Sequence, residues 1–196
     1  NCKEEIENSI LEIVNCYKNK GKLLICGNGG SASDSLHIVG ELMKSFVLSR
    51  KLENKYIDKI KNIFPQEAEY FINNLQSSLP AIALVSETSL ITAYSNDNNS
   101  ELVFAQQVLG YGNEGDILIA ISTSGNSKNV IYASQISKVK GMKVISLTGK
   151  LGGELKDISD ININVEEKET YIIQEYHLSI YHTLCLEVEN EIFGEE

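Results

Sequence analysis

A histidine and a glutamate stand four residues apart in the segment that runs from Cys26 to Leu42. On a helix, His37 and Glu41 would leave the same face, because residues i and i+4 are neighbours there. An imidazole and a carboxylate on one face can share a metal ion or divide acid–base work between them. The same spacing is also common in pairs that only cap a helix or face solvent. The pair alone leaves both interpretations open.

Two loops rich in glycine and hydroxyl residues are candidates for phosphate binding. GNGGS covers residues 27–31, and STSGNS covers residues 122–127. Each follows an apolar run and precedes helical spacing, so backbone N–H groups and the positive end of a helix would meet an anion there. Neither loop has a nucleotide-binding GKS/T motif or a dinucleotide-binding GxGxxG pattern. With Lys128 the only basic residue within or beside the second loop, hydroxyls and N–H groups favour a small phosphomonoester over ordinary turn and capping duty.

The predicted C-terminal helix, residues 170–193, carries three further candidates. Gln174 and His177 are three residues apart and share a face by spacing. His182 lies about 12 Å further along the helix axis than Gln174 and ~80° around it. Spacing alone therefore favours His177 as the partner of Gln174, yet a single helical histidine is more often structural than a ligand. The choice between the two histidines stays open on geometry.

Five short apolar runs alternate with helical segments and predict the sheet that positions these residues. They cover residues 22–26, 80–85, 116–122, 142–149 and 161–165. Their lack of in/out alternation indicates a parallel sheet that is covered on both faces. We therefore expect an α/β fold, a three-layer αβα sandwich around a central five-stranded parallel sheet of the doubly wound type. Both candidate loops follow strands, where ligands collect in such folds.

Composition limits the classes of partner. A chain of 196 residues suits one domain, residues 1–196. The net charge is −10 with a single arginine, which excludes a basic face for nucleic acid or acidic membranes. No apolar run approaches the ~20 residues of a membrane span, and the segment NCKEEIENS is not typical of a signal peptide. Four cysteines without a CxxC pair indicate reduced packing residues, so we expect a cytoplasmic protein.

From Leu23 to Glu187 the chain resembles the sugar isomerase (SIS) domain family, and within it the sedoheptulose-7-phosphate isomerases, also called phosphoheptose isomerases. Five segments carry the resemblance: CGNGGSASDSLHIVGEL, SND (95–97), GDILIAISTSGNSKNVI, GMKVISLTGKLGG and IIQEYHLSIYHTLC. The resemblance implies a homotetramer with sites between subunits. It also implies conversion of sedoheptulose 7-phosphate to D-glycero-D-manno-heptose 7-phosphate, the first step of heptose synthesis for surface glycans such as lipopolysaccharide or capsule.

Roles for individual residues are likewise implied by the resemblance. One zinc ion per subunit would be held by His37, Glu41, Gln174 and His182, with Glu41 as base and His182 as acid. His177 would then be a packing or interface residue. Substrate contacts would be Asn28, Gly29, Gly30, Ser31, Glu41, Asn96, Asp97, Ser122, Thr123, Ser124, Ser127 and Gln174.

One stretch departs from the family pattern, and one rival function remains. Residues 51–79 are about 20 residues longer than the family leads us to expect, and they predict a helical insertion with two short helices flanking Pro65. The rival is a non-catalytic SIS module that binds proteins, like the DnaA initiator-associating relatives, or that senses a phosphosugar. Such relatives lack the acid and the late histidine, so Glu41 and His182 together favour the enzyme.

Overall fold

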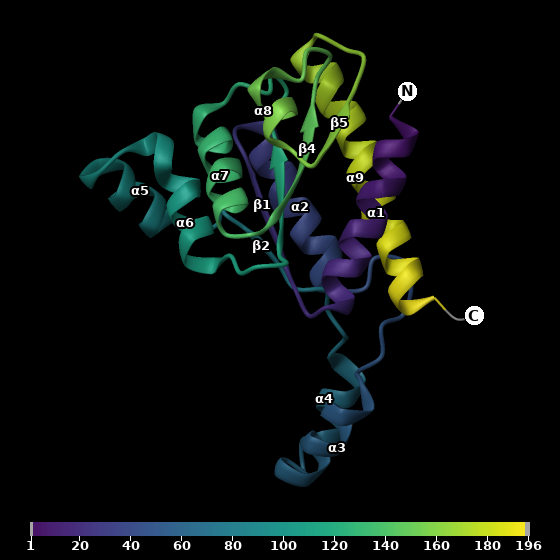
Figure 1. The fold of residues 1–196 in the computed structure, drawn as a ribbon. Helices are drawn as coiled ribbons and strands as arrows, with labels where there is room; N and C mark the ends of the chain where they lie inside the picture. The colour runs from purple at the N-terminus through teal and green to yellow at the C-terminus, as the bar shows by residue number, and fades with distance from the viewer. Residues whose placement is uncertain (1, 195–196) are drawn as a thin grey trace.

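The computed structural model describes residues 2–194 and has a five-stranded parallel sheet at its centre (Figure 1). The strand order is β2-β1-β3-β4-β5. The strands are β1 (Leu23–Gly27), β2 (Ala81–Ala83), β3 (Ile117–Ile121), β4 (Lys143–Thr148) and β5 (Ile161–Asn164). Because β1 and β3 are neighbours, the two candidate loops leave the same edge of the sheet side by side. The predicted α/β architecture is confirmed.

Helices cover both faces of the sheet. They are α1 (Lys3–Lys18), α2 (Gly30–Met43), α3 (Asn54–Ile63), α4 (Ala68–Asn74), α5 (Thr88–Asp97), α6 (Val103–Tyr111), α7 (Lys128–Val139), α8 (Gly153–Ile158) and α9 (Thr170–Phe193), with a 3-10 turn η1 (Ser100–Leu102). Alternate residues of β1 face opposite ways: Leu23 and Ile25 pack with α1, α2 and α9, whereas Leu24 and Cys26 pack with α6, α7 and α8. All four are buried, as a doubly covered sheet requires.

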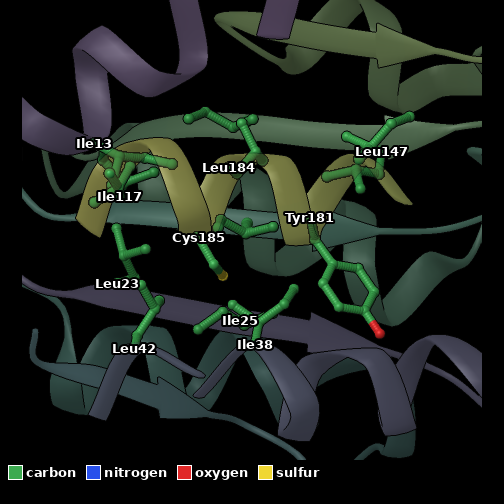
Figure 2. Close-up of a cluster of buried hydrophobic side chains, with 14 of the residues drawn as sticks. Ile13, Leu23, Ile25, Ile38, Leu42, Ile117, Leu147, Tyr181, Leu184 and Cys185 are labelled. Carbon is green, nitrogen blue, oxygen red and sulfur yellow. The ribbon is translucent and has the colours of Figure 1, made fainter. Parts of the chain in front are cut away.

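One core layer fixes α2 and α9 beside each other. Figure 2 shows Leu184, Cys185 and Tyr181 of α9 above Ile25 of the sheet and Ile38 of α2. All five side chains are buried, and burying one large aliphatic side chain stabilises the fold by roughly 1.5–3 kcal/mol. The candidate side chains of α2 and α9 are therefore presented on a rigid pair of helices.

Helix α1 ends at a left-handed residue. Lys20 takes that conformation, with φ +64°. The N–H groups of Lys20 and Gly21 bond the carbonyls of Tyr17 and Cys16, which is the Schellman pattern. Helix α5 continues to Asp97, so the segment SND (95–97) lies within it.

The stretch 51–79 forms an arm that projects from the body (Figure 1). The two helices predicted on either side of Pro65 are confirmed as α3 and α4. No residue of α3, 54–63, is buried, although Tyr56 and Ile63 are large and apolar.

Two observations bear on the expectations about membrane spans and cysteines. Between residues 2 and 194, no helix combines the length and the apolar character needed to cross a bilayer. The four cysteines are free, and Cys16, Cys26 and Cys185 are buried packing residues.

Candidate functional site

His37 is the centre of a polar cluster between α2 and α9. Its Nε2 lies 3.2 Å from Oε1 of Glu41, one turn later on α2. Its ring is 5.0 Å from the ring of His182, at nearly a right angle. Ile38 and Leu42 pack into the core on the apolar side of α2. His37 and Glu41 therefore lie on the adjacent side of the helix, next to α9. The structure thus brings together three of the residues that the sequence analysis selected.

Tyr181 belongs to the same cluster, and the sequence analysis missed it. Its hydroxyl lies 2.9 Å from Nδ1 of His37, and its ring meets the His182 ring edge-on at 4.9 Å. Asp34, one turn before His37, is a second missed member. Burial raises the pKa of the Asp34 carboxyl, while the Tyr181 hydroxyl and the His37 ring oppose that rise. Beside an apolar Ile180 on a buried helix, Tyr181 had no sequence signal beyond its adjacency to His182.

The cluster has one sheltered and one open side. The Glu41 side chain is only 14% exposed, whereas that of His37 is 44% exposed. Lys44 adds a positive charge 3.0 Å from the second Glu41 oxygen. Nε2 of His182 is buried and has no hydrogen-bond partner within the described part of the chain. A buried nitrogen without a partner costs free energy unless a ligand or water occupies it.

Gln174 lies away from the His37 cluster, nearer the start of both helices. Its side-chain amide sits directly against Gly30, where a Cβ atom would collide with it. Helix α9 is regular from Thr170 onward, so Gln174 and His182 keep their separation of about 12 Å along the axis. Within one chain, Gln174 therefore stands at the loop end of α2. His177 is fully buried, as expected of a packing residue.

The first candidate loop contacts the start of α7, the helix that follows the second loop. The amides of Asn28 and Asn129 pair through two hydrogen bonds of 2.9 Å. In the second loop the hydroxyl oxygens of Ser122 and Ser127 are 3.0 Å apart at the start of α7. Gly29 has φ +56°, a conformation that places the backbone at the start of α2 without strain. Asn129, in the first turn of α7, is a further residue that the sequence analysis missed.

Lysines from distant parts of the sequence lie close to the second loop. Gly125, with φ +68°, packs against the Gly152 carbonyl and holds the loop on the segment after β4. A cleft of about 280 Å³ there is lined by Thr123, Ser124, Asn126, Lys150, Leu151, Glu167, Lys168 and Ile173. Lys150 pairs with Glu166, and Lys128 pairs with Glu154. Lys128 is therefore not the only basic residue near the loop in space.

Asn96 and Asp97 lie elsewhere. They occupy the exposed end of α5, where the Asn96 amide donates to the Asp97 carboxylate at 2.9 Å. Helix α5 packs on η1 and α6, on the face of the sheet opposite α2 and α9. Within a single chain these two residues are not part of the His37 cluster.

The donor set of the cluster suits zinc, although the ligands are not drawn together around one point. Two imidazoles and a carboxylate are ligand types that Zn²⁺ prefers, and Nε2 of His182 lacks a protein partner among residues 2–194. Over the same residues, no three His, Cys, Asp or Glu side chains are gathered closely enough to hold a metal ion.

Comparisons with known proteins indicate the family of this chain. Residues 63–149 match the family model described as SIS domain. The phosphoheptose isomerase of Clostridium acetobutylicum is 39% identical over 98% of this chain and 85% of the relative. That of Helicobacter pylori is 41% identical over 93% and 81%. A solved phosphoheptose isomerase from Francisella tularensis superposes with a TM-score of 0.80 at 33% identity, covering 97% of this chain and 87% of that one. The chain belongs to the phosphoheptose isomerase family.

Proposed function

We propose that this protein converts sedoheptulose 7-phosphate to D-glycero-D-manno-heptose 7-phosphate, which supplies heptose for surface glycans such as lipopolysaccharide or capsule. Membership of the phosphoheptose isomerase family supports the reaction class. The observation that carries the proposal is the contact of Glu41 and His182 with one imidazole, His37, in a partly sheltered cluster. A sensing or protein-binding module has no need for an acid and a base in that arrangement.

The reaction moves a proton between two adjacent carbons through an enediol. In the proposal, the Glu41 carboxylate takes the proton from one carbon and returns it to the other, and His182 serves the two oxygens as acid. Lys44 places a positive charge 3.0 Å from the Glu41 carboxylate. The shelter around Glu41 strengthens these electrostatic interactions, because water screens them less there.

The phosphate end of the substrate is assigned to the two loops. Their N–H groups, the Ser122, Thr123, Ser124 and Ser127 hydroxyls and the start of α7 would hold the anion. Asn28, Gly29, Gly30 and Ser31 are the proposed contacts on the first loop. Asn96, Asp97 and Gln174 remain proposed contacts that another subunit would have to bring to the same substrate. Binding at this distant end would orient the reacting carbons.

Zinc is part of the proposal, with His37, Glu41, Gln174 and His182 as its ligands, one ion per subunit. When bound, the ion would polarise the substrate carbonyl. Since Gln174 and His182 of one chain stand about two turns apart on the same helix, the complete set requires the first turns of α9 to unwind or a second subunit to contribute a ligand. Leu36, Met43 and Val47, exposed beside the cluster, support a homotetramer with sites between subunits. We also propose that it works in the cytoplasm.

The test is direct turnover. Purified protein is incubated with sedoheptulose 7-phosphate, and the aldose product is followed by NMR while zinc content is measured. The expected result is heptose phosphate formed by the wild type and not by Glu41→Gln. Binding of the phosphosugar without any product would refute the isomerase and favour the non-catalytic SIS module instead.

A further inference from the structure

We propose that Asn129 is a positioning residue of the isomerase reaction, which fixes the start of α7 relative to α2. It acts through the side chain of Asn28. The inference rests on the proposed function and deepens it, because it says how the groups that hold the phosphate stay in register with the carboxylate that moves the proton. A pair of hydrogen bonds between the first loop and the first turn of α7 carries it.

Helices α2 and α7 belong to different core layers. Ile38 and Leu42 of α2 pack in the layer on one face of the sheet. Val130 and Ile131 of α7 pack in the layer on the other face. Apolar packing therefore relates each helix to the strands between them and not directly to the other helix. A direct connection has to come from the loops at the carboxyl edge of the sheet.

The side-chain amides of Asn28 and Asn129 provide that connection. Nδ2 of each residue donates to Oδ1 of the other, and both bonds are 2.9 Å long. Because hydrogen bonds are directional, a planar amide that donates and accepts at once is fixed in orientation as well as in distance. Within residues 2–194, no other side-chain hydrogen bond joins residues 27–43 to residues 122–139.

Each end of the pair is tied to its helix. The carbonyl of Asn28 accepts the N–H of Ser31 at 3.0 Å, in the first turn of α2. Asn129 lies in the first turn of α7, where the N–H groups have no carbonyl inside the helix to bond and can hold an anion. The pair therefore relates the phosphate end of the substrate to the helix that carries Glu41. A misplaced phosphate would displace the reacting carbons from that base.

Pairing leaves part of the Asn28 amide for the substrate. An amide has two N–H donors and two acceptor lone pairs. The bonds with Asn129 use one of each, so one N–H and one lone pair of Asn28 remain, held in a fixed direction. Asn28 is exposed and Asn129 is half-buried, so Asn28 is the more accessible member of the pair. This division agrees with Asn28 as a proposed substrate contact and Asn129 as its support.

The experiment compares Asn129→Leu with Gln135→Leu. Leucine is close to asparagine in size but cannot form the amide pair. The start of α7 should survive the change, because the N–H of Val130 still donates to the carbonyl of Ser127, at 3.0 Å. Gln135 is an exposed residue of the same helix, and its amide makes no hydrogen bond within residues 2–194. The control therefore removes an amide from α7 without removing a connection.

Steady-state kinetics with sedoheptulose 7-phosphate is the first readout. Asn129→Leu should lower kcat by about 10-fold or more, since a misplacement of about 1 Å can cost about 100-fold. KM should change little, because the groups that hold the phosphate remain. A residue that only binds substrate would raise KM, and one that only supports the fold would lower the melting temperature without changing kcat. Gln135→Leu should match the wild type.

A double variant tests whether Asn129 acts through Asn28. In a protein that already carries Asn28→Ala, the amide that Asn129 holds is gone. Adding Asn129→Leu should then cause no further loss of kcat. A further loss as large as that in the wild-type background would overturn the inference, because Asn129 would then act by another route.

Hydrogen exchange of the substrate-free protein is a readout that needs no turnover. Asn129→Leu should speed the exchange of the backbone N–H groups of residues 28–32, across the pair from the substitution, and Gln135→Leu should not. If the wild type isomerises the substrate, an unchanged kcat in folded Asn129→Leu overturns the inference. If the wild type shows no turnover, the isomerase proposal fails, and exchange decides the rest. Faster exchange at residues 28–32 then supports the connection, and unchanged exchange overturns it.

Discussion

A buried ion pair holds the chain that follows α2 against α9. Nε of Arg50 donates to Oε1 of Glu189 at 2.6 Å, and both side chains are fully buried. Glu189 also accepts the backbone N–H groups of residues 46–48, at 2.8 to 2.9 Å. Arg50 donates in addition to the carbonyls of Glu41 and Leu42. The pair therefore anchors the end of the helix that carries the proposed base.

Glu189→Gln should destabilise the fold strongly. The carboxylate accepts four hydrogen bonds, two on each oxygen, whereas an amide accepts on one oxygen only. Its NH₂ group would face donors, and Arg50 would keep a buried charge without a counter-charge. Removing one partner of a buried pair costs about 3–5 kcal/mol. That is a large part of the 5–15 kcal/mol that typically separates folded from unfolded protein.

Urea unfolding followed by circular dichroism, at one fixed protein concentration, measures the loss. With a slope of about 2 kcal/mol per molar urea, the midpoint should fall by about 2 M. Glu12→Gln is the control, because it removes a carboxylate from the partly exposed pair with Lys143 and should cost less than 1 kcal/mol. Equal small losses in both variants would refute the reasoning.

Acid provides a second check on the same residue. Three backbone N–H groups and Arg50 lower the pKa of Glu189 against the opposing effect of burial. The folded state therefore binds this proton less readily than the unfolded state. The contribution to stability is complete above the ordinary glutamate pKa of about 4.3 and is lost as the pH falls below it. Wild type should show this decline, and Glu189→Gln should lack that part of it.

Four further predictions, with five substitutions, test the site and its surroundings. Glu41→Gln should fold normally and lose at least ~100-fold in turnover, the scale of a general base, in the NMR assay. Ser127→Ala should mainly raise KM, by ~10-fold for one lost charged hydrogen bond, in steady-state kinetics. His182→Ala should lose zinc and activity together, whereas His177→Ala should keep both, as metal analysis of the purified variants would show. Burial lowers the pKa of His177 to about 4. The free energy of unfolding should therefore fall by about 3 kcal/mol as the pH drops from 6.5 to 4. In His177→Phe, the free energy of unfolding should change less over this pH range.

The strands and both loops were predictable because the signal for each lies in a few consecutive residues of the sequence. A buried parallel strand is a continuous apolar run, and β1, β3 and β4 match the predicted runs closely. The glycine and hydroxyl loops follow those runs directly, so their position at the carboxyl edge of the sheet follows from strand order. Residues 54–63 and 68–74 also follow from local signals, since Pro65 separates two segments with helical spacing.

Contacts between distant segments were not predictable. Asn28 meets Asn129, and Lys150 and Lys168 reach the loop that holds Ser124, through the packing of elements far apart in the chain. Helical spacing correctly gives the distance between Gln174 and His182 but not what faces either of them. Tyr181 reads as an ordinary core aromatic until α2 is placed beside it.

One close steric contact and two polar contacts, at three levels, set how far α2 and α9 are shifted along each other. Gln174 meets Gly30 at the loop end, Tyr181 meets His37 in the middle, and Glu189 holds the segment beyond Leu42. Apolar burial is non-directional, so the core layer between these helices brings them together without specifying a shift of one or two ångströms. Hydrogen bonds are directional and do specify it. A misplacement of about 1 Å can cost an enzyme about 100-fold in rate. The only direct link within residues 2–194 from the Arg50–Glu189 pair to a proposed substrate contact is the hydrogen bond from Arg50 to the Glu41 carbonyl. Because the pair fixes the end of α2, it bears on catalysis as well as on stability.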